Sequence, residues 1–129
     1  MRPQFTPGNN IALKVPAHEY SKTVHFYESI LGFARRPLAA GAEYASVAFA
    51  YGDKNLWIDC VEGMSQAEVW LELQAPDVER AQQYLADNGC YICNEIERLP
   101  NDFDGFWVSS PCNIIHLVTG VESPGETAG

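Results

Sequence analysis

Six side chains in this sequence are of types that could do chemistry or hold a ligand. Each stands in a short segment where polar and apolar residues alternate: Asn10, Trp57, Asp59, Trp70, Glu72 and His116. Side chains two apart on a β-strand point to the same face of a sheet. The carboxylates and the imidazole could bind a divalent metal or move a proton, and the indoles could stack on a flat ligand.

The same alternation predicts which strand faces pack on helices. The residues between the candidates are mostly apolar, and we expect them to form the buried faces: Ile11, Leu13 and Val15; Leu56, Ile58 and Cys60; Val69, Leu71 and Leu73; Ile115, Leu117 and Thr119. The candidate residues then share the other side. Because an indole is costly to leave in water, Trp57 and Trp70 favour a ligand site there. Trp107 adds a third indole if its side chain turns the same way.

The elements that position these residues form an internal repeat. Each half predicts one strand, one helix and three more strands, and Gly32 and Gly89 end the helices. The first half has a helix at 19–31 and strands at 11–15, 34–38, 43–51 and 55–61. The second has a helix at 78–88, with Asp77 as a suitable N-cap, and strands at 68–74, 90–97, 103–109 and 113–119. Neither half alone covers its sheet, so the repeat predicts an α+β fold of two βαβββ modules in one domain.

Composition and charge limit the classes of function. The chain has 129 residues, of which 47% are apolar and 19% charged, enough for one compact domain. A net charge of −9 disfavours nucleic acid and anionic membranes as partners and favours cations. No stretch approaches the roughly 20 apolar residues of a membrane span, and no signal-peptide pattern is visible. We therefore expect a cytoplasmic protein with reduced cysteines. Cys90 and Cys93 form a C-x-x-C in a predicted strand, which indicates a structural role.

Three segments resemble the vicinal oxygen chelate superfamily, which includes glyoxalase I, extradiol dioxygenases, fosfomycin resistance enzymes and bleomycin resistance proteins. They are Asn-Ile-Ala-Leu-Lys-Val-Pro at 10–16, His-Phe-Tyr-Glu-Ser-Ile-Leu-Gly-Phe at 25–33, and Phe-Trp-Val-Ser-Ser-Pro-Cys-Asn-Ile-Ile-His-Leu-Val at 106–118. The resemblance implies a mixed sheet curled into a half-open cup, with the helices outside. It implies a single domain over 1–120, with modules at about 8–62 and 67–119. Residues 121–129 are rich in Gly, Glu and Ser and predict a flexible tail.

Members of this superfamily that are enzymes hold a divalent metal with side chains of the first and last strands of each module. Carried over by resemblance, these positions fall on Asn10, Asp59, Trp70 and His116, where the superfamily usually has His or Gln, Glu, His and Glu. Tryptophan cannot ligate a metal, because its indole nitrogen only donates, and an asparagine oxygen is a weak ligand. Two competent ligands rarely hold a catalytic metal, so we expect none. A rewired site would use Asp59, His116 and Glu72.

The sequence therefore predicts a protein similar to the bleomycin resistance type, which binds a small aromatic or cationic molecule in a tryptophan-lined cup. Its expected lining is Asn10, Trp57, Asp59, Trp70, Glu72, Trp107 and His116. The alternative is a metal-dependent lyase, isomerase or dioxygenase, with His116 as a candidate general base paired with Asp59. A third possibility is that Trp57 and Trp70 fill the cup themselves. The resemblance also implies a homodimer.

Overall fold

The computed structural model describes residues 2–38 and 45–120 of the chain. These residues divide into two compact units, which we describe separately. The first unit is Asn9–Trp70, and the second consists of residues 2–8 and 71–120. The tail expected at 121–129 and the beginning of the strand expected at 43–51 lie outside the described residues.

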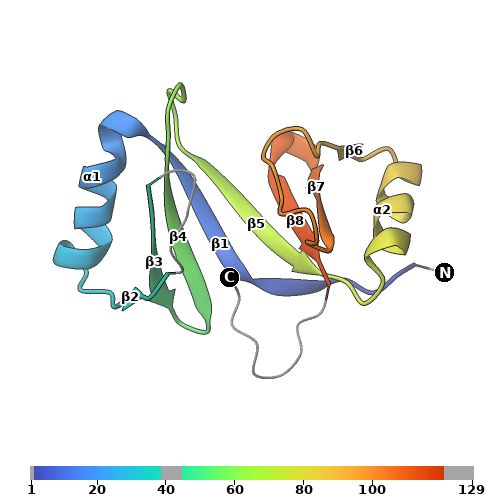
Figure 1. Cartoon of the computed structure of the whole chain (residues 1–129), viewed down its shortest axis with the longest axis horizontal. Coiled ribbons are helices and arrows are strands. Elements are labelled where there is room, and N and C mark those ends of the chain that lie inside the picture. Colours follow the sequence, from blue (N-terminus) through green and yellow to red (C-terminus); the bar gives the residue numbers. More distant parts are fainter. Residues whose placement is uncertain (1, 39–44, 121–129) are drawn as a thin grey trace. The chain divides into compact units, whose positions relative to one another are not determined.

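The first unit is a βαβββ module, drawn from blue to green in Figure 1. Its strands follow the order β2-β3-β4-β1, with β1 parallel to β4 and the other neighbours antiparallel. Its elements are β1 (Thr6–Pro16), α1 (Ala17–His25), a π-helical turn η1 (Phe26–Ile30), β2 (Arg35–Arg36), β3 (Ser46–Tyr51) and β4 (Lys54–Val61).

The core of the first unit lies between these strands and α1. Phe49 and Ile58 are fully buried in it, and Tyr20, Val24 and Tyr27 pack against the buried strand residues. These three aromatic and aliphatic side chains recur at helical spacing, which is why the segment folds as a helix with one apolar side. The helix predicted at 19–31 is confirmed, although its last turn is π-helical.

The second unit repeats the βαβββ order, drawn from yellow to red in Figure 1. Its strands follow the order β5-β8-β7-β6, with β5 parallel to β8. Its elements are β5 (Glu68–Gln74), α2 (Val78–Asp87), β6 (Tyr91–Ile92), β7 (Gly105–Ser109), a 3₁₀ turn η2 (Pro111–Asn113) and β8 (Ile115–Thr119). The first three residues of β5 belong to the first unit, and the first three residues of β1, residues 6–8, belong to the second.

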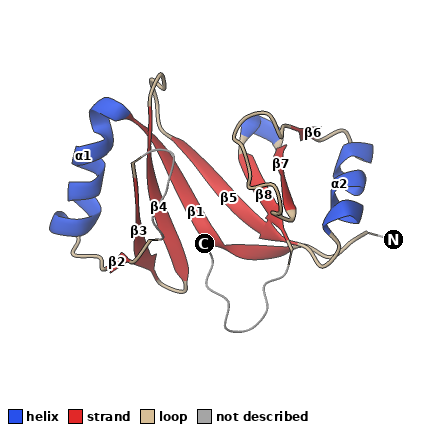
Figure 2. Ribbon diagram, viewed as in Figure 1, coloured by secondary structure: helices blue, strands red, loops and turns tan. Residues whose placement is uncertain are grey.

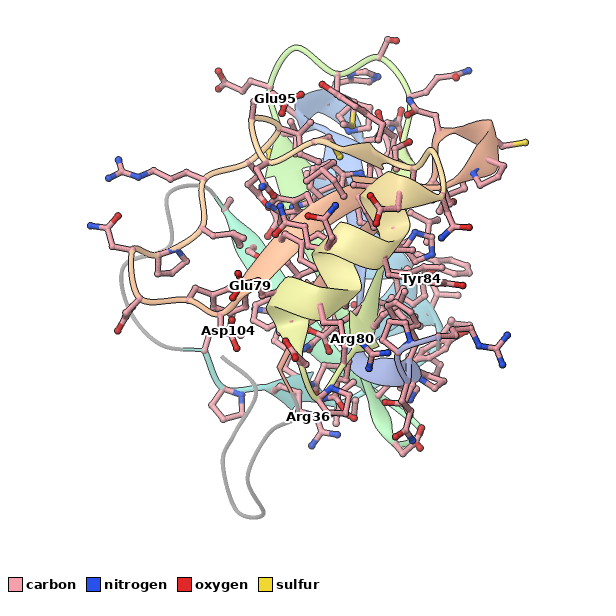
Figure 3. The ribbon with its side chains drawn as sticks, turned by 90° about the vertical axis from the view of Figure 1, so that its right-hand side faces the viewer. Arg36, Glu79, Arg80, Tyr84, Glu95 and Asp104 are labelled. Atoms are coloured by element: carbon pink, nitrogen blue, oxygen red, sulfur yellow. The ribbon has the colours of Figure 1, made fainter. Side chains whose placement is uncertain are left out.

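Helix α2 covers one face of the second unit's strands. Val78 and Ala81 lie on its buried side, against Phe106 and Val118. Its exposed side carries Glu79 and Arg80, which Figure 3 labels on the helix nearest the viewer. The helix begins as predicted, because the Asp77 side chain accepts a hydrogen bond of 3.1 Å from the backbone amide of Arg80.

The α+β class and the two βαβββ modules are confirmed (Figure 2). Two predicted strands are much shorter than expected: 34–38 is reduced to β2 and 90–97 to β6. Beyond β6 the backbone amide of Trp107 donates to the side chain of Asn94, at 2.8 Å, instead of to a partner strand. A side-chain acceptor thus ends the ladder, which the apolar pattern of 90–97 did not indicate. Within the described ranges, no helix is long and apolar enough to cross a membrane.

Candidate functional site

The polar candidates of the first unit share one face of β1, β3 and β4. The strand register pairs Asn10 with Asn55, Ala12 with Trp57 and Lys14 with Asp59, while Ser46 of β3 is opposite Asp59. We call this set the polar face: Asn10, Lys14, Ser46, Asn55, Trp57 and Asp59. The opposite face carries Ile11, Leu13, Val15, Leu56 and Ile58, which pack with α1. The predicted alternation of β1 and β4 is therefore confirmed.

Asp59 is held in a buried network with Lys14 and Ser46. The Lys14 Nζ donates to Asp59 Oδ2 at 2.7 Å, and the two residues are 3% and 6% exposed. The Ser46 hydroxyl donates to the other carboxylate oxygen. Both oxygens of Asp59 are thus satisfied, and its charge is neutralised by an ammonium of the same chain. Lys14 was missed by the sequence analysis, although it follows Asn10 and Ala12 at the spacing of one strand face.

A second network orients the indole of Trp57. Its Nε1 donates to Asn10 Oδ1 at 2.8 Å, and the same oxygen accepts from Asn55 Nδ2 at 3.1 Å. Trp57 remains partly exposed. The amide oxygen that could have been a weak metal ligand is therefore occupied by two N–H donors, and it serves to fix an aromatic ring.

Trp70 is the second indole of the first unit. Its Nε1 donates to Glu68 Oε1 at 3.0 Å, and its ring lies under the Lys14 ammonium, with Nζ 4.4 Å from the ring centroid. This distance is within the range of a cation–π interaction. Trp70 is partly exposed as well. The side chain predicted to bind a ligand cation thus already contacts a cation of the protein.

In the second unit the register separates His116 from the other candidates. His116 is opposite Leu71 and Val108, on the face whose neighbours Phe106 and Val118 pack against α2. Glu72 and Trp107 are both opposite Leu117, on the other face. The prediction that His116 shares a face with Glu72, and that Leu117 packs on the helix side, is therefore wrong by one residue of register.

The remaining candidates have local partners. His116 Nδ1 lies 3.1 Å from the carbonyl oxygen of Ile114, which can accept a hydrogen bond when Nδ1 carries a hydrogen. Trp107 is 5% exposed, and its Nε1 donates to the Glu97 carbonyl oxygen at 3.0 Å. Gly8 lies so close to Glu72 that a Cβ placed there would be 2.4 Å from Glu72 Cγ. The pairing of His116 with Asp59 stays a prediction.

A hollow of about 480 Å³ lies beside the β4–β5 loop, lined by residues 61–68. Its lining contains neither Trp57 nor Trp70, so it is not the predicted indole-walled site. Glu68 lines it and also accepts the hydrogen bond from the Trp70 indole.

Comparison with solved structures identifies the fold. The Mn(II)-bound glyoxalase of Novosphingobium aromaticivorans superposes with a TM-score of 0.65 at 14% identity over 92% of this chain. Homoprotocatechuate 2,3-dioxygenase of Arthrobacter globiformis gives 0.63 at 17% identity over 94% of it. A glyoxalase/bleomycin resistance protein/dioxygenase superfamily member from Vibrio splendidus gives 0.60 at 14% identity over 86% of it. The chain has the vicinal oxygen chelate fold.

The likeness is one of fold, because the identities are low. This chain spans 40% of the length of the glyoxalase and 39% of the dioxygenase, but 97% of the Vibrio splendidus protein. No protein-family model and no curated protein sequence matches the chain.

The residues at the expected metal positions of this vicinal oxygen chelate fold do not fit a divalent ion. Asp59 is neutralised by Lys14, the Asn10 oxygen accepts two N–H groups, and Trp70 has no lone pair to offer. Among residues 2–38 and 45–120, no three His, Cys, Asp or Glu side chains form a group that could hold a metal. What the first unit offers instead is two oriented, partly exposed indoles beside a neutralised ion pair.

Proposed function

We propose that this chain is a small-molecule-binding protein of the glyoxalase/bleomycin-resistance type. It holds a small aromatic or cationic molecule against Trp57 and Trp70, without a catalytic metal. The observation that carries the proposal is that both indoles are partly exposed while each ring nitrogen is held by a hydrogen bond. Rings fixed in this way present their faces to a ligand at little further cost in conformational entropy.

The energetics favour a flat ligand. An aromatic pair contributes about 0.5–1.5 kcal/mol beyond the area it buries, and a desolvated cation–π contact about 2 kcal/mol. The net charge of −9 attracts cations toward the protein at long range. Next to the indoles, however, Lys14 cancels the charge of Asp59, which favours ligands recognised by stacking as well as by charge.

Tryptophan fluorescence tests this proposal. We expect saturable quenching of the wild type by a planar probe from a panel that includes the acridine cation proflavine and neutral indole-sized aromatics. The Trp70→Ala variant should lose this response. Trp107→Phe is the matched control, since it removes a buried indole of the second unit and should leave the response intact. The absence of any response across the panel would contradict the proposal.

The second candidate function is a metal-dependent lyase, isomerase or dioxygenase; His116 and Glu72, which lie on opposite faces of the second unit's strands, cannot both ligate its metal. The observation that favours it is the likeness to a glyoxalase that is bound to Mn(II) and to a dioxygenase. Elemental analysis after loading with nickel, zinc, manganese or ferrous iron and dialysis distinguishes the two. Near one metal per chain, lost in His116→Ala, would support the enzyme.

We further propose that the protein works as a homodimer in the cytoplasm. We propose the dimer by resemblance to the small-molecule-binding members of the superfamily. Sedimentation equilibrium tests it. The reducing compartment agrees with four cysteines that are all free thiols, namely Cys60, Cys90, Cys93 and Cys112.

A further inference from the structure

The cation that faces Asp59 is supplied by the chain itself. Lys14 and Asp59 are opposite each other on the parallel strands β1 and β4, and Nζ lies 2.7 Å from Oδ2. Both residues are buried, at 3% and 6% exposure. Because an unpaired charge at such depth is strongly unfavourable, the Asp59 carboxylate requires the Lys14 ammonium.

The surroundings of the Lys14 ammonium are those of a cation-binding site. An anionic oxygen of Asp59 contacts it, and the Trp70 ring lies 4.4 Å from Nζ. The Ser46 hydroxyl donates to the second oxygen of Asp59 and so fixes the carboxylate. An anionic oxygen and an aromatic face are the two features that bind ammonium groups in proteins.

We propose that this is a cation-binding position whose cation is built into the chain: the Lys14 ammonium occupies it and excludes an external divalent metal or small ammonium ion from Asp59. A divalent ion at Asp59 would lie next to the buried ammonium, and repulsion between like charges is strong where water is excluded. Lys14 takes this role because its ammonium is a compact charge on a flexible stem. The Lys14 ammonium occupies this position whether or not a ligand binds Trp57 and Trp70.

Rescue of Lys14→Ala by an external ammonium tests the proposal. The substitution removes three carbons and the ammonium nitrogen and leaves the buried carboxylate without its counter-ion. We expect the melting temperature to fall by more than about 5 °C. Because n-propylammonium replaces the lost atoms, it should raise the melting temperature saturably, whereas uncharged 1-propanol should not. The wild type and the double variant Lys14→Ala/Asp59→Asn should not respond to n-propylammonium.

A measurement on the wild type keeps the test decisive if Lys14→Ala does not fold. In equilibrium dialysis against Mn(II), we expect the wild type and Asp59→Asn to retain the same amount of metal. One Mn(II) per chain in the wild type that is lost in Asp59→Asn would overturn the proposal. An unchanged melting temperature in Lys14→Ala, no rescue by n-propylammonium, or equal rescue by 1-propanol would overturn it as well.

Discussion

The buried Lys14–Asp59 pair gives a quantitative prediction for stability. Lys14→Met leaves the Asp59 carboxylate, 6% exposed, without its ammonium, and Asp59→Leu removes this carboxylate from the Lys14 ammonium. Breaking a buried pair on one side typically costs about 3–5 kcal/mol in the free energy of unfolding. Asp59→Leu also takes the acceptor from the Ser46 hydroxyl, which adds about 1 kcal/mol. The double variant buries no charge and keeps similar volumes, so we expect it within about 1 kcal/mol of the wild type.

Urea unfolding followed by far-ultraviolet circular dichroism measures the three variants without relying on the indoles. The two single losses should not add, and the coupling free energy should be at least about 3 kcal/mol. Glu28→Gln is a matched control, because it breaks the Glu28–Arg35 ion pair at the surface and should change stability little. The reasoning is refuted if the double variant is destabilised by the sum of the single variants.

Two further predictions follow from local contacts. Asp77→Ala should lower the free energy of unfolding by about 1 kcal/mol, because it removes the cap on the Arg80 amide. Asp87→Ala, at the other end of α2, should lower it by less, and urea unfolding compares the two variants. Burial raises the pKa of the Cys93 thiol, so at pH 8 it holds less thiolate than an ordinary cysteine. Cys93 should therefore react with iodoacetamide more slowly than the exposed Cys112, as peptide mass spectrometry can measure; equal rates would contradict this.

The module architecture could be predicted from the sequence because it follows from the periodic spacing of apolar residues. The helical spacing of Tyr20, Val24 and Tyr27 and the alternation of β1 and β4 each specify a buried face, and the structure buries those faces. The Asp77 cap was equally visible, since a helix N-terminus needs a side-chain acceptor at that place. That the two modules form a single domain stays a prediction.

The face of the sheet on which each β8 side chain lies could not be predicted from the apolar pattern of the strand. Apolar residues stand on both faces of β8, Ile115 and Leu117 on one and Val118 on the other, so the apolar pattern does not single out one face as the buried one. The turn before the strand contains two residues with positive φ angles, Cys112 at 62° and Asn113 at 59°. Non-glycine residues rarely adopt this conformation, and the apolar pattern of the strand gives no sign of it. In the structure His116 lies on the face of Phe106 and Val118 rather than on the face of Glu72 and Trp107.

The oversight at Lys14 has a different physical origin, and it bears most on function. Alternation already placed Lys14 on the face of Asn10, but only the register of β1 against β4 shows that its ammonium reaches Asp59. A carboxylate on this fold can serve an external cation only if no internal one neutralises it. The identity of one neighbouring side chain therefore decides whether this carboxylate binds an external cation or is neutralised by the chain itself. The fold is the same in both cases, since this chain shares it at 14–17% identity with a glyoxalase and a dioxygenase. Comparing expected ligand positions alone would assign Asp59 to a metal, and the charge of the residue opposite it argues against that assignment.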